Sequence, residues 1–355
     1  MAQTIRSLNH NLLLQEFYDR FHQEIRQQAL DLIGVSRKGW LPRCRRWLLE
    51  PFIFTLEGRK NFFRTALSVA MGELIGKPGV GWIIGATGEI AWTCALLTDD
   101  LIDGSQEREG HVCAHMVYGR VRTFLAINFA LWRVFFSLIT RPPVSFPARI
   151  RMVGLSIRLL LMCVSSQLPV VGSAGNLKAF YKHAERVNNS NHWALVAPAI
   201  ACGDREIVAA AWEYATAIAI NGKMQNDLLD YCGGSTESET LYRDFKSRYV
   251  TFPILVLLEQ EIDESDRDRI ERYFSGHDGG ALTVGDLNNL FLRYRTFQRC
   301  LDLMRDQMGA AVQAVRRIES RLEVPEQFSR LLLTWTWDAV DWAEERIQAW
   351  RDAHG

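Results

Sequence analysis

Two groups of oxygen-bearing side chains are spaced so that each could bind a divalent cation. In the first group, Asp99, Asp100 and Asp103 follow an apolar run at residues 90–97. Asp99 and Asp103 are one helical turn apart, so a helix would direct both carboxylates to the same face. Like charges at this spacing destabilise a helix, and desolvation beside an apolar segment adds to the cost. Bound Mg²⁺ removes both costs, so the pattern predicts a metal site, with a solvated helix end as the alternative.

The second group repeats this arrangement much later in the chain. Asn226, Asp227 and Asp230 follow a mostly apolar segment at residues 209–220. Their spacing of three and four positions places all three side chains on one face of a helix. Mg²⁺ commonly shares its ligands with substrate phosphates, so two such helix ends could hold a diphosphate through several Mg²⁺ ions at the mouth of an apolar cavity. A coincidental pair of acidic helix ends is the less favoured alternative.

The segments that must position these side chains have helical periodicity almost throughout, and strand alternation is nearly absent. Glycine and proline clusters separate them, and no linker is long enough to divide two domains. The sequence therefore predicts an all-α fold, a single bundle over residues 1–355 around a deep apolar cavity. The expected helices span approximately residues 8–32, 61–75, 82–102, 113–139, 147–168, 176–202, 204–231, 252–258, 265–274, 284–295, 296–322 and 325–352.

Charge and composition limit the partners and the location. The chain has 41 basic and 41 acidic residues, and this balance argues against nucleic acid as the main partner. The apolar runs at residues 82–97 and 123–140 contain Glu89 and Arg133, so we expect helices inside a helical protein and not an integral membrane protein. The seven scattered cysteines lack a CxxC pair, and the first ten residues lack a signal-peptide pattern. Both features predict a cytoplasmic protein with reduced thiols.

Taken together, these motifs resemble those of the trans-isoprenyl diphosphate synthases, the polyprenyl synthetase family, with the strongest match over residues 58–253. Residues 89–103 are similar to the first aspartate-rich motif of the family with its preceding helix, and residues 225–230 are similar to the second. The other matching positions are Arg108, Gly110, His115, Tyr118, Gly119, Lys182, Ala184, Asp244, Thr251 and Pro253.

The resemblance implies an isoprenoid-synthase-type bundle that ionises a prenyl diphosphate substrate with about three Mg²⁺ ions per active site, and it suggests a homodimer by analogy. It implies that Arg108 and Lys182, together with Lys60 and Arg64, bind diphosphate. Ionisation of the allylic C–O bond needs no protein nucleophile, because the cations stabilise the leaving diphosphate. The implied metal ligands are Asp99, Asp100, Asp103, Asn226, Asp227 and Asp230, of which Asp99, Asp100, Asp103 and Asp227 are the implied catalytic residues.

This sequence departs from the family pattern where the second substrate, isopentenyl diphosphate, binds in typical members. Lys60 and Arg64 are one residue further apart than in the family's Gly-Lys-x-x-Arg element. Trp92 stands where the family has His or Gln, and Glu109 replaces an arginine. A carboxylate at this position repels a second diphosphate. An aromatic side chain could instead stabilise a carbocation or stack against another acceptor.

Our main hypothesis from the sequence is therefore a terpene synthase or prenyltransferase, a lyase or transferase that does not use isopentenyl diphosphate. The alternatives are a conventional synthase that elongates with isopentenyl diphosphate, or a non-catalytic paralogue. If the enzyme is active, Asp99→Ala or Asp227→Ala should remove turnover and leave the helical fold intact.

The depth of the pocket is also encoded near the first motif. By resemblance, Cys94 and Ala95 form the floor of the cavity for the growing chain, with Trp92 beside them. Both floor residues are small, which favours a C15–C20 substrate over a C5 one. Tight packing between helices is the alternative explanation for their size.

Overall fold

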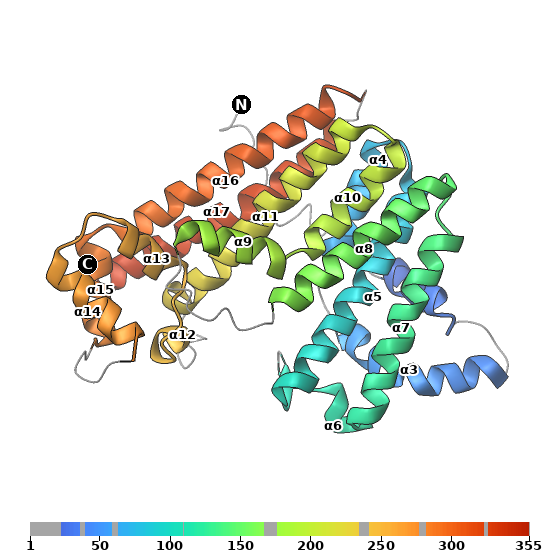
Figure 1. Cartoon of the computed structure of the whole chain (residues 1–355), viewed down its shortest axis with the longest axis horizontal. Helices are drawn as coiled ribbons and strands as arrows, with labels where there is room; N and C mark the ends of the chain where they lie inside the picture. Colours follow the sequence, from blue (N-terminus) through green and yellow to red (C-terminus); the bar gives the residue numbers. More distant parts are fainter. Residues whose placement is uncertain are drawn as a thin grey trace. The chain divides into compact units, whose positions relative to one another are not determined.

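The computed structural model describes residues 23–35, 40–58, 63–108, 110–166, 176–233, 241–276, 282–322 and 326–354. Nearly all of these residues are helical (Figure 1), and their only strands form one two-residue antiparallel hairpin. The predicted all-α fold is confirmed. The cavity at its centre stays a prediction.

The chain divides into two compact units. Unit 1 comprises Met1–Leu160, Ser190–Trp212 and Val315–Leu332, and unit 2 comprises Leu161–Asn189, Glu213–Ala314 and Leu333–Gly355. The single domain over residues 1–355 stays a prediction.

Unit 1 contains helical residues 23–33 and the elements α3 (Trp40–Gly58), α4 (Phe63–Leu74), α5 (Pro78–Asp103), β1 (Glu107–Arg108), β2 (His111–Val112), α6 (Ala114–Tyr118), α7 (Arg120–Thr140), most of α8 (Phe146–Ser166) and α10 (Ser190–Cys202). Unit 2 contains α9 (Leu177–Val187), most of α11 (Arg205–Cys232), α12 (Arg243–Lys246), α13 (Phe252–Glu259), α14 (Glu264–Phe274), α15 (Val284–Arg293), and most of α16 (Thr296–Glu319) and α17 (Glu326–His354).

Helix α5, which carries the first acidic group, packs against α4, α7 and α10. Glycines allow its backbone to approach α4 closely, because a Cβ atom on Gly81 would lie 2.5 Å from the carbonyl oxygen of Ser68. The buried carboxylate of Glu89 on α5 accepts hydrogen bonds from the backbone N–H and the hydroxyl of Thr65 on α4, at 3.2 and 3.3 Å. Tight packing and a buried polar contact thus fix α5 within unit 1.

Three local features differ from the sequence-based expectation. The helix expected over residues 113–139 is divided into α6 and α7 by Gly119, whose φ of 82° disfavours a side chain. The helix expected over residues 176–202 is divided between α9 and α10 at residues 188–189. Helix α3 was not predicted, because Pro51 inside it interrupts the helical pattern. Most of the helix expected at residues 8–32 lies outside the described residues.

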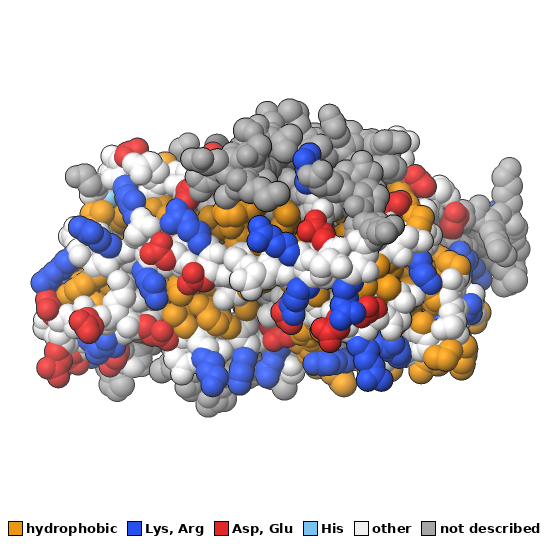
Figure 2. All heavy atoms as spheres, turned by 90° about the horizontal axis from the view of Figure 1, so that it is seen from above, with side chains coloured by type: hydrophobic (Ala, Val, Ile, Leu, Met, Phe, Trp, Pro, Cys, Tyr) orange, Lys and Arg blue, Asp and Glu red, His pale blue; other side chains and the backbone are white. Residues whose placement is uncertain are grey.

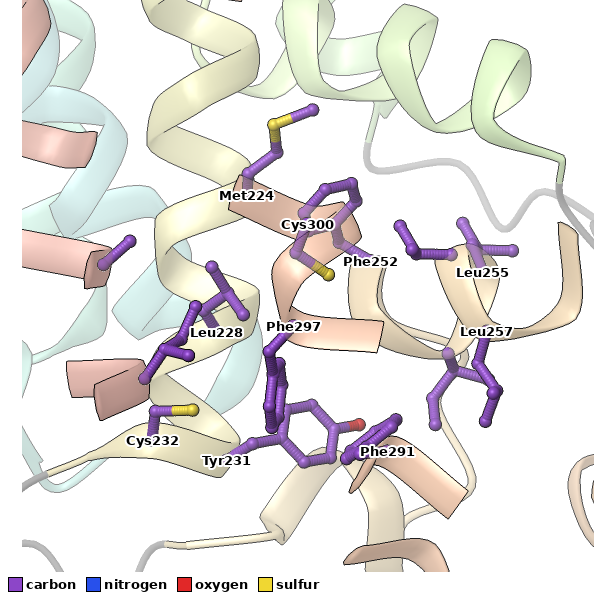
Figure 3. Packing of buried hydrophobic residues seen from close by; sticks show 14 of the residues in the cluster. Met224, Leu228, Tyr231, Cys232, Phe252, Leu255, Leu257, Phe291, Phe297 and Cys300 are labelled. Atoms are coloured by element: carbon purple, nitrogen blue, oxygen red, sulfur yellow. The ribbon is translucent and has the colours of Figure 1, made fainter. Parts of the chain in front are cut away.

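The core of unit 2 holds the C-terminal half of α11 in place (Figure 3). Leu228, Tyr231 and Cys232 of α11 pack with aromatic residues of α13, α15 and α16. The ring centroids of Tyr231 and Phe291 are 5.4 Å apart in an edge-to-face arrangement. The hydroxyl groups of Tyr231 and Thr251 are 2.7 Å apart. The second acidic group therefore lies on a rigid, well-packed helix.

Within the described part of the chain, two helices, α5 and α7, are long and apolar enough, by length and composition, to cross a membrane. Inside unit 1, 67% of the apolar window of α5 is buried, whereas only 39% of that of α7 is. The expectation that residues 123–140 form a helix inside the protein is therefore met only in part, because α7 exposes a stripe that includes Val121, Phe124 and Trp132. On the face seen in Figure 2, acidic and basic side chains are interspersed along the surface, with hydrophobic patches between them.

Candidate functional site

The first acidic group occupies the last turn of α5, which ends at Asp103 and is followed by Gly104 in the left-handed conformation. The hairpin formed by β1 and β2 then brings Arg108 back toward the helix. Nη2 of Arg108 lies 2.5 Å from Oδ2 of Asp99, and Nε lies 2.7 Å from Oδ1 of Asp100. The side chain of Asp99 is 44% exposed, whereas that of Asp100 is buried. We call Asp99, Asp100, Asp103 and Arg108 the first cluster.

Electrostatics explains why an arginine is held here. Carboxylates at the C-terminal end of a helix face the negative end of its dipole, and the last turn of α5 contains no basic residue. Burial opposes the charge on Arg108, but its hydrogen bonds to Asp100 and Asp99 raise the pKa of the guanidinium. Burial also raises the pKa of the Cys113 thiol, and the neighbouring Asp100 raises it further. Arg108 therefore supplies the positive charge that the two carboxylates require.

The second acidic group lies at the C-terminal end of α11. Nζ of Lys223, one turn earlier on the same helix, lies 2.5 Å from Oδ1 of Asp227. Oδ2 of Asp227 accepts a hydrogen bond of 2.9 Å from the backbone N–H of Phe252, the first residue of α13. Asp227 is only 3% exposed, and burial raises its pKa although Lys223 and the Phe252 N–H act in the opposite direction. Asp227 thus links α11 to α13.

Asp230 links α11 to the next segment in a similar way. Its Oδ1 accepts hydrogen bonds from the backbone N–H groups of Arg243 and Asp244, at 2.8 and 3.2 Å. Burial raises the pKa of Asp230. Its Oδ2 is buried and has no hydrogen-bond partner among the described residues. Asn226 is exposed on the same helix. We call Asn226, Asp227, Asp230 and Lys223 the second cluster.

The donors of both clusters have the right chemistry for a hard divalent cation. Carboxylate and amide oxygens are the protein ligands that Mg²⁺ prefers, and the buried unpartnered oxygen of Asp230 is a position where a cation would satisfy an unmet charge. Among the described residues, no three His, Cys, Asp or Glu side chains converge on one point. Mg²⁺ commonly completes its coordination with water and substrate phosphates.

The basic residues that the sequence predicts to bind diphosphate lie on different elements. Lys182 is exposed on α9, beside His183. Burial lowers the pKa of His183, the charge of Lys223 lowers it further, and Asp227 raises it, so this part of α9 lies near the second cluster. Lys60 and Glu109 lie outside the described residues.

Arg64 and Trp92 are in direct contact. The Cζ atom of Arg64, in the first turn of α4, lies 3.6 Å from the centre of the Trp92 ring on α5. Nε of Arg64 donates a hydrogen bond of 2.8 Å to the hydroxyl of Ser190, the first residue of α10. Three helices of unit 1 therefore meet at one guanidinium.

The two small residues predicted to form the pocket floor have different surroundings. Cys94 is buried, and its thiol donates a hydrogen bond of 3.8 Å to the carbonyl oxygen of Ile127 on α7. Ala95 is half-buried. Cys94 thus contacts α7, and the role of both residues in setting the depth of the pocket stays a prediction.

Sequence reasoning overlooked two participants. Lys223 lies four residues before Asp227, and this spacing is the sequence signal for a helical ion pair. Ser190 is 126 positions from Arg64, and no local pattern connects them.

Comparison with known proteins identifies a family whose model matches this sequence. The polyprenyl synthetase family model matches residues 45–281, a range that includes both clusters and the predicted range 58–253. No curated protein matches the sequence.

Solved structures share the fold. The chain is similar to a geranylgeranyl pyrophosphate synthetase from Pyrococcus horikoshii Ot3, with 16% identity, a TM-score of 0.71, and 91% of this chain and 98% of that chain covered. It is also similar to a decaprenyl diphosphate synthase from Rhodobacter capsulatus, with 21% identity, a TM-score of 0.64, and 93% and 99% covered. A polyprenyl synthase from Caulobacter crescentus CB15, solved with calcium and isoprenyl diphosphate, has 21% identity, a TM-score of 0.64, and 92% and 96% covered.

At these identities the structural likeness establishes the fold, while the family model covers about two thirds of the chain and both acidic motifs. The chain belongs to the polyprenyl synthetase family.

Proposed function

We propose that this protein is a prenyl diphosphate synthase, which transfers an allylic prenyl group to isopentenyl diphosphate and releases diphosphate. The observation that carries the proposal is the contact of Arg108 with Asp99 and Asp100, at 2.5 and 2.7 Å. This arrangement places an anion-binding guanidinium directly beside two oxygen ligands for a cation. A magnesium diphosphate satisfies both partners of the pair at once, because its phosphates take Arg108 and its cation takes the carboxylates.

The metal would be held by Asp99, Asp100 and Asp103 in the first cluster, and by Asn226, Asp227 and Asp230 in the second. When bound, Mg²⁺ neutralises the negative charge that develops on the departing diphosphate. The number of ions, about three, is part of this proposal.

The residues of the chain have distinct roles in the proposed reaction. Arg108 and Lys182 stabilise the leaving diphosphate by charge-assisted hydrogen bonds. Lys60 and Arg64 bind the diphosphate of the second substrate. Apolar side chains exclude water, so that the allylic cation reacts with isopentenyl diphosphate and not with solvent. Cys94 and Ala95 set the length of the allylic substrate, C15 to C20.

The comparisons favour this elongation over our main hypothesis from the sequence, because the named structural relatives are prenyl diphosphate synthases. The second candidate is an enzyme that ionises the same substrate but passes the cation to its own chain or to another acceptor. Two sequence features favour this candidate, namely Trp92 and Glu109 at positions where the family binds isopentenyl diphosphate.

Product analysis distinguishes these functions. The purified protein is incubated with Mg²⁺ and a C10, C15 or C20 allylic diphosphate, each with and without isopentenyl diphosphate. Longer diphosphates that form only with isopentenyl diphosphate support elongation. A hydrocarbon or alcohol that forms from the allylic diphosphate alone supports the second candidate. No release of diphosphate from any substrate supports a non-catalytic paralogue.

We also propose that a second copy of the chain covers the exposed stripe of α7. The side chains of Val121, Phe124 and Trp132 are 75%, 59% and 60% exposed, which is unfavourable in water. These side chains lie on one face of α7. In a symmetric dimer this face would pack against the same face of the second copy. Light scattering of wild type and Phe124→Asp tests this proposal. A dimer that becomes a monomer supports it, and a wild-type monomer contradicts it. The cytoplasmic location stays a prediction.

A further inference from the structure

Arg64 is held from two directions by residues of other helices. Trp92 contacts the face of the guanidinium, with 3.6 Å between Cζ and the ring centre. Ser190 accepts the hydrogen bond from Nε, at 2.8 Å. A face contact and an edge contact together determine the plane of the guanidinium and its rotation within that plane. Such a group is oriented before any ligand arrives.

The helix start that carries Arg64 is also fixed. The next residue, Thr65, donates two hydrogen bonds to the buried Glu89, which lies about one turn before Trp92 on α5. The backbone that carries Arg64 and the Trp92 ring that contacts its guanidinium therefore belong to α4 and α5, two helices that are fixed against each other. Ser190 lies at the start of α10, which packs against both α4 and α5.

The position of Trp92 relates Arg64 to the first cluster. Trp92 and Asp99 are seven residues apart on α5, which is two helical turns. They consequently share one face of the helix and are separated by about 10 Å along its axis. Because Arg64 stacks on Trp92, its guanidinium lies beside α5 at the turn that carries Trp92. A second diphosphate bound there would lie along the same face as the one bound beside Asp99.

The stack also leaves the recognition chemistry of the guanidinium intact. An aromatic ring contacts the face of the group, whereas the N–H donors that bind phosphate lie in its plane. Trp92 can therefore replace a hydrogen-bonding residue without binding phosphate itself. Its contribution is to hold Arg64 in one orientation, which reduces the entropy lost when phosphate binds.

We propose that Trp92 and Ser190 are positioning residues, which orient Arg64 to bind the diphosphate of the second substrate. This inference rests on the proposed function and concerns only the isopentenyl diphosphate half of the site. It gives Trp92 the opposite meaning from the one suggested by sequence alone. The tryptophan adapts the half-site and does not abolish it.

Titration calorimetry of the full chain with Mg²⁺ and isopentenyl diphosphate tests the inference without requiring turnover. Trp92→Leu removes the ring and should raise the Kd for isopentenyl diphosphate about tenfold, while the Kd for the allylic diphosphate changes by less than about twofold. Trp92→Phe keeps a π face and should restore most of the affinity. Ser190→Ala should raise the Kd about threefold, because it removes the hydrogen bond that Nε of Arg64 donates to Ser190.

Two comparisons separate positioning from a merely structural role. In an Arg64→Ala background, Trp92→Leu should have no further effect on the Kd, because the tryptophan acts through the arginine. The matched control is Trp82→Leu, which removes another half-buried tryptophan from the same helix and should leave the Kd unchanged. Circular dichroism confirms that each variant is folded.

The failures of the two proposals are distinguishable. The inference is overturned if wild type does not bind isopentenyl diphosphate, if Trp92→Leu leaves its Kd unchanged, or if the effect persists without Arg64. An equal change in the Kd for the allylic diphosphate overturns it as well. If isopentenyl diphosphate binds and responds to Trp92 as expected but no longer product forms, the inference stands and the proposed elongation fails.

Discussion

The two acidic clusters have similar sequences, but their contacts differ. In the first cluster, Asp99 and Asp100 contact Arg108 from a neighbouring hairpin, and the side chain of Asp99 is 44% exposed. In the second cluster, Asp227 is buried and contacts Lys223 on its own helix and the backbone of α13. Asp230 likewise accepts hydrogen bonds from two backbone N–H groups.

This difference assigns different roles to the two clusters. The partner of the first cluster is a side chain that can move to a phosphate, so its carboxylates can change partners at little cost to the fold. The partners of the second cluster include backbone groups at the start of α12 and α13, and the buried N–H of Phe252 would lose its acceptor if Asp227 were removed. We therefore expect the first cluster to contribute mainly to activity, and the second to both activity and stability.

The largest expected effect is the loss of enzyme activity when a carboxylate of the first cluster is replaced. Asp99→Asn should reduce diphosphate release about a thousandfold, because it removes a charge that holds the cation and Arg108. The thermal midpoint should change little, since Asp99 is partly exposed and contacts the side chain of Arg108. The matched control is Asp268→Asn, which removes a carboxylate from an exposed ion pair with Arg272. Near-normal turnover of Asp99→Asn would contradict the role of this cluster.

The second cluster should be distinguished by stability. Asp227→Ala leaves the buried N–H of Phe252 without its acceptor and Lys223 without its partner. It should lower the free energy of unfolding by about 1–3 kcal/mol, in addition to the loss of activity. The expectation from sequence alone was an intact fold. Urea unfolding of Asp227→Ala and Asp99→Ala measures the difference, and equal stability of the two variants would remove the distinction between the clusters.

A smaller effect on stability is expected when the positive charge of Lys223 in the second cluster is removed. Lys223→Gln keeps a hydrogen-bond donor near Asp227 but removes the charge. We expect the free energy of unfolding to fall by about 1 kcal/mol, because a buried carboxylate loses its ion-pair partner. Urea unfolding detects this loss. A more stable Lys223→Gln protein would indicate that the ion pair does not compensate its own desolvation.

The smallest effect concerns a carboxylate outside both clusters. Asp286 forms a capping box with Thr283 at the start of α15, and these hydrogen bonds, with Arg269, lower its pKa to about 2. Its stabilising contribution is therefore present above the unfolded pKa, near 4, and is lost as the pH falls toward 2. The stability difference between wild type and Asp286→Asn should shrink between pH 5 and pH 2. A difference that does not depend on pH over this range would show that the charge of Asp286 is irrelevant.

Much of this site could be predicted because its signals are local. The spacing of Asp99 and Asp103, and of Asp227 and Asp230, follows the turn of a single helix, and the apolar runs before them identify those helices. The contacts that distinguish the clusters depend on tertiary structure. The hairpin that returns Arg108 to Asp100 and the approach of Phe252 to Asp227 join different elements, so no periodic pattern reveals them.

The same distinction holds for the fold. Helices α5 and α11 are continuous in pattern and were predicted within a few residues of their ends. The division between α6 and α7 depends on the conformation of one glycine, Gly119, whose flanking residues are all compatible with a helix. Helix α3 contains Pro51 and is stabilised by its packing against α7, a contact that the sequence does not encode locally.

The central claim, prenyl transfer to isopentenyl diphosphate, is tested most directly with labelled isopentenyl diphosphate. Wild-type protein is incubated with Mg²⁺, a C15 allylic diphosphate and the labelled compound, and the products are separated by chain length. We expect the label in a longer prenyl diphosphate, and no such product from Asp99→Asn. A wild-type protein that consumes the allylic diphosphate while the label remains in isopentenyl diphosphate would contradict the claim.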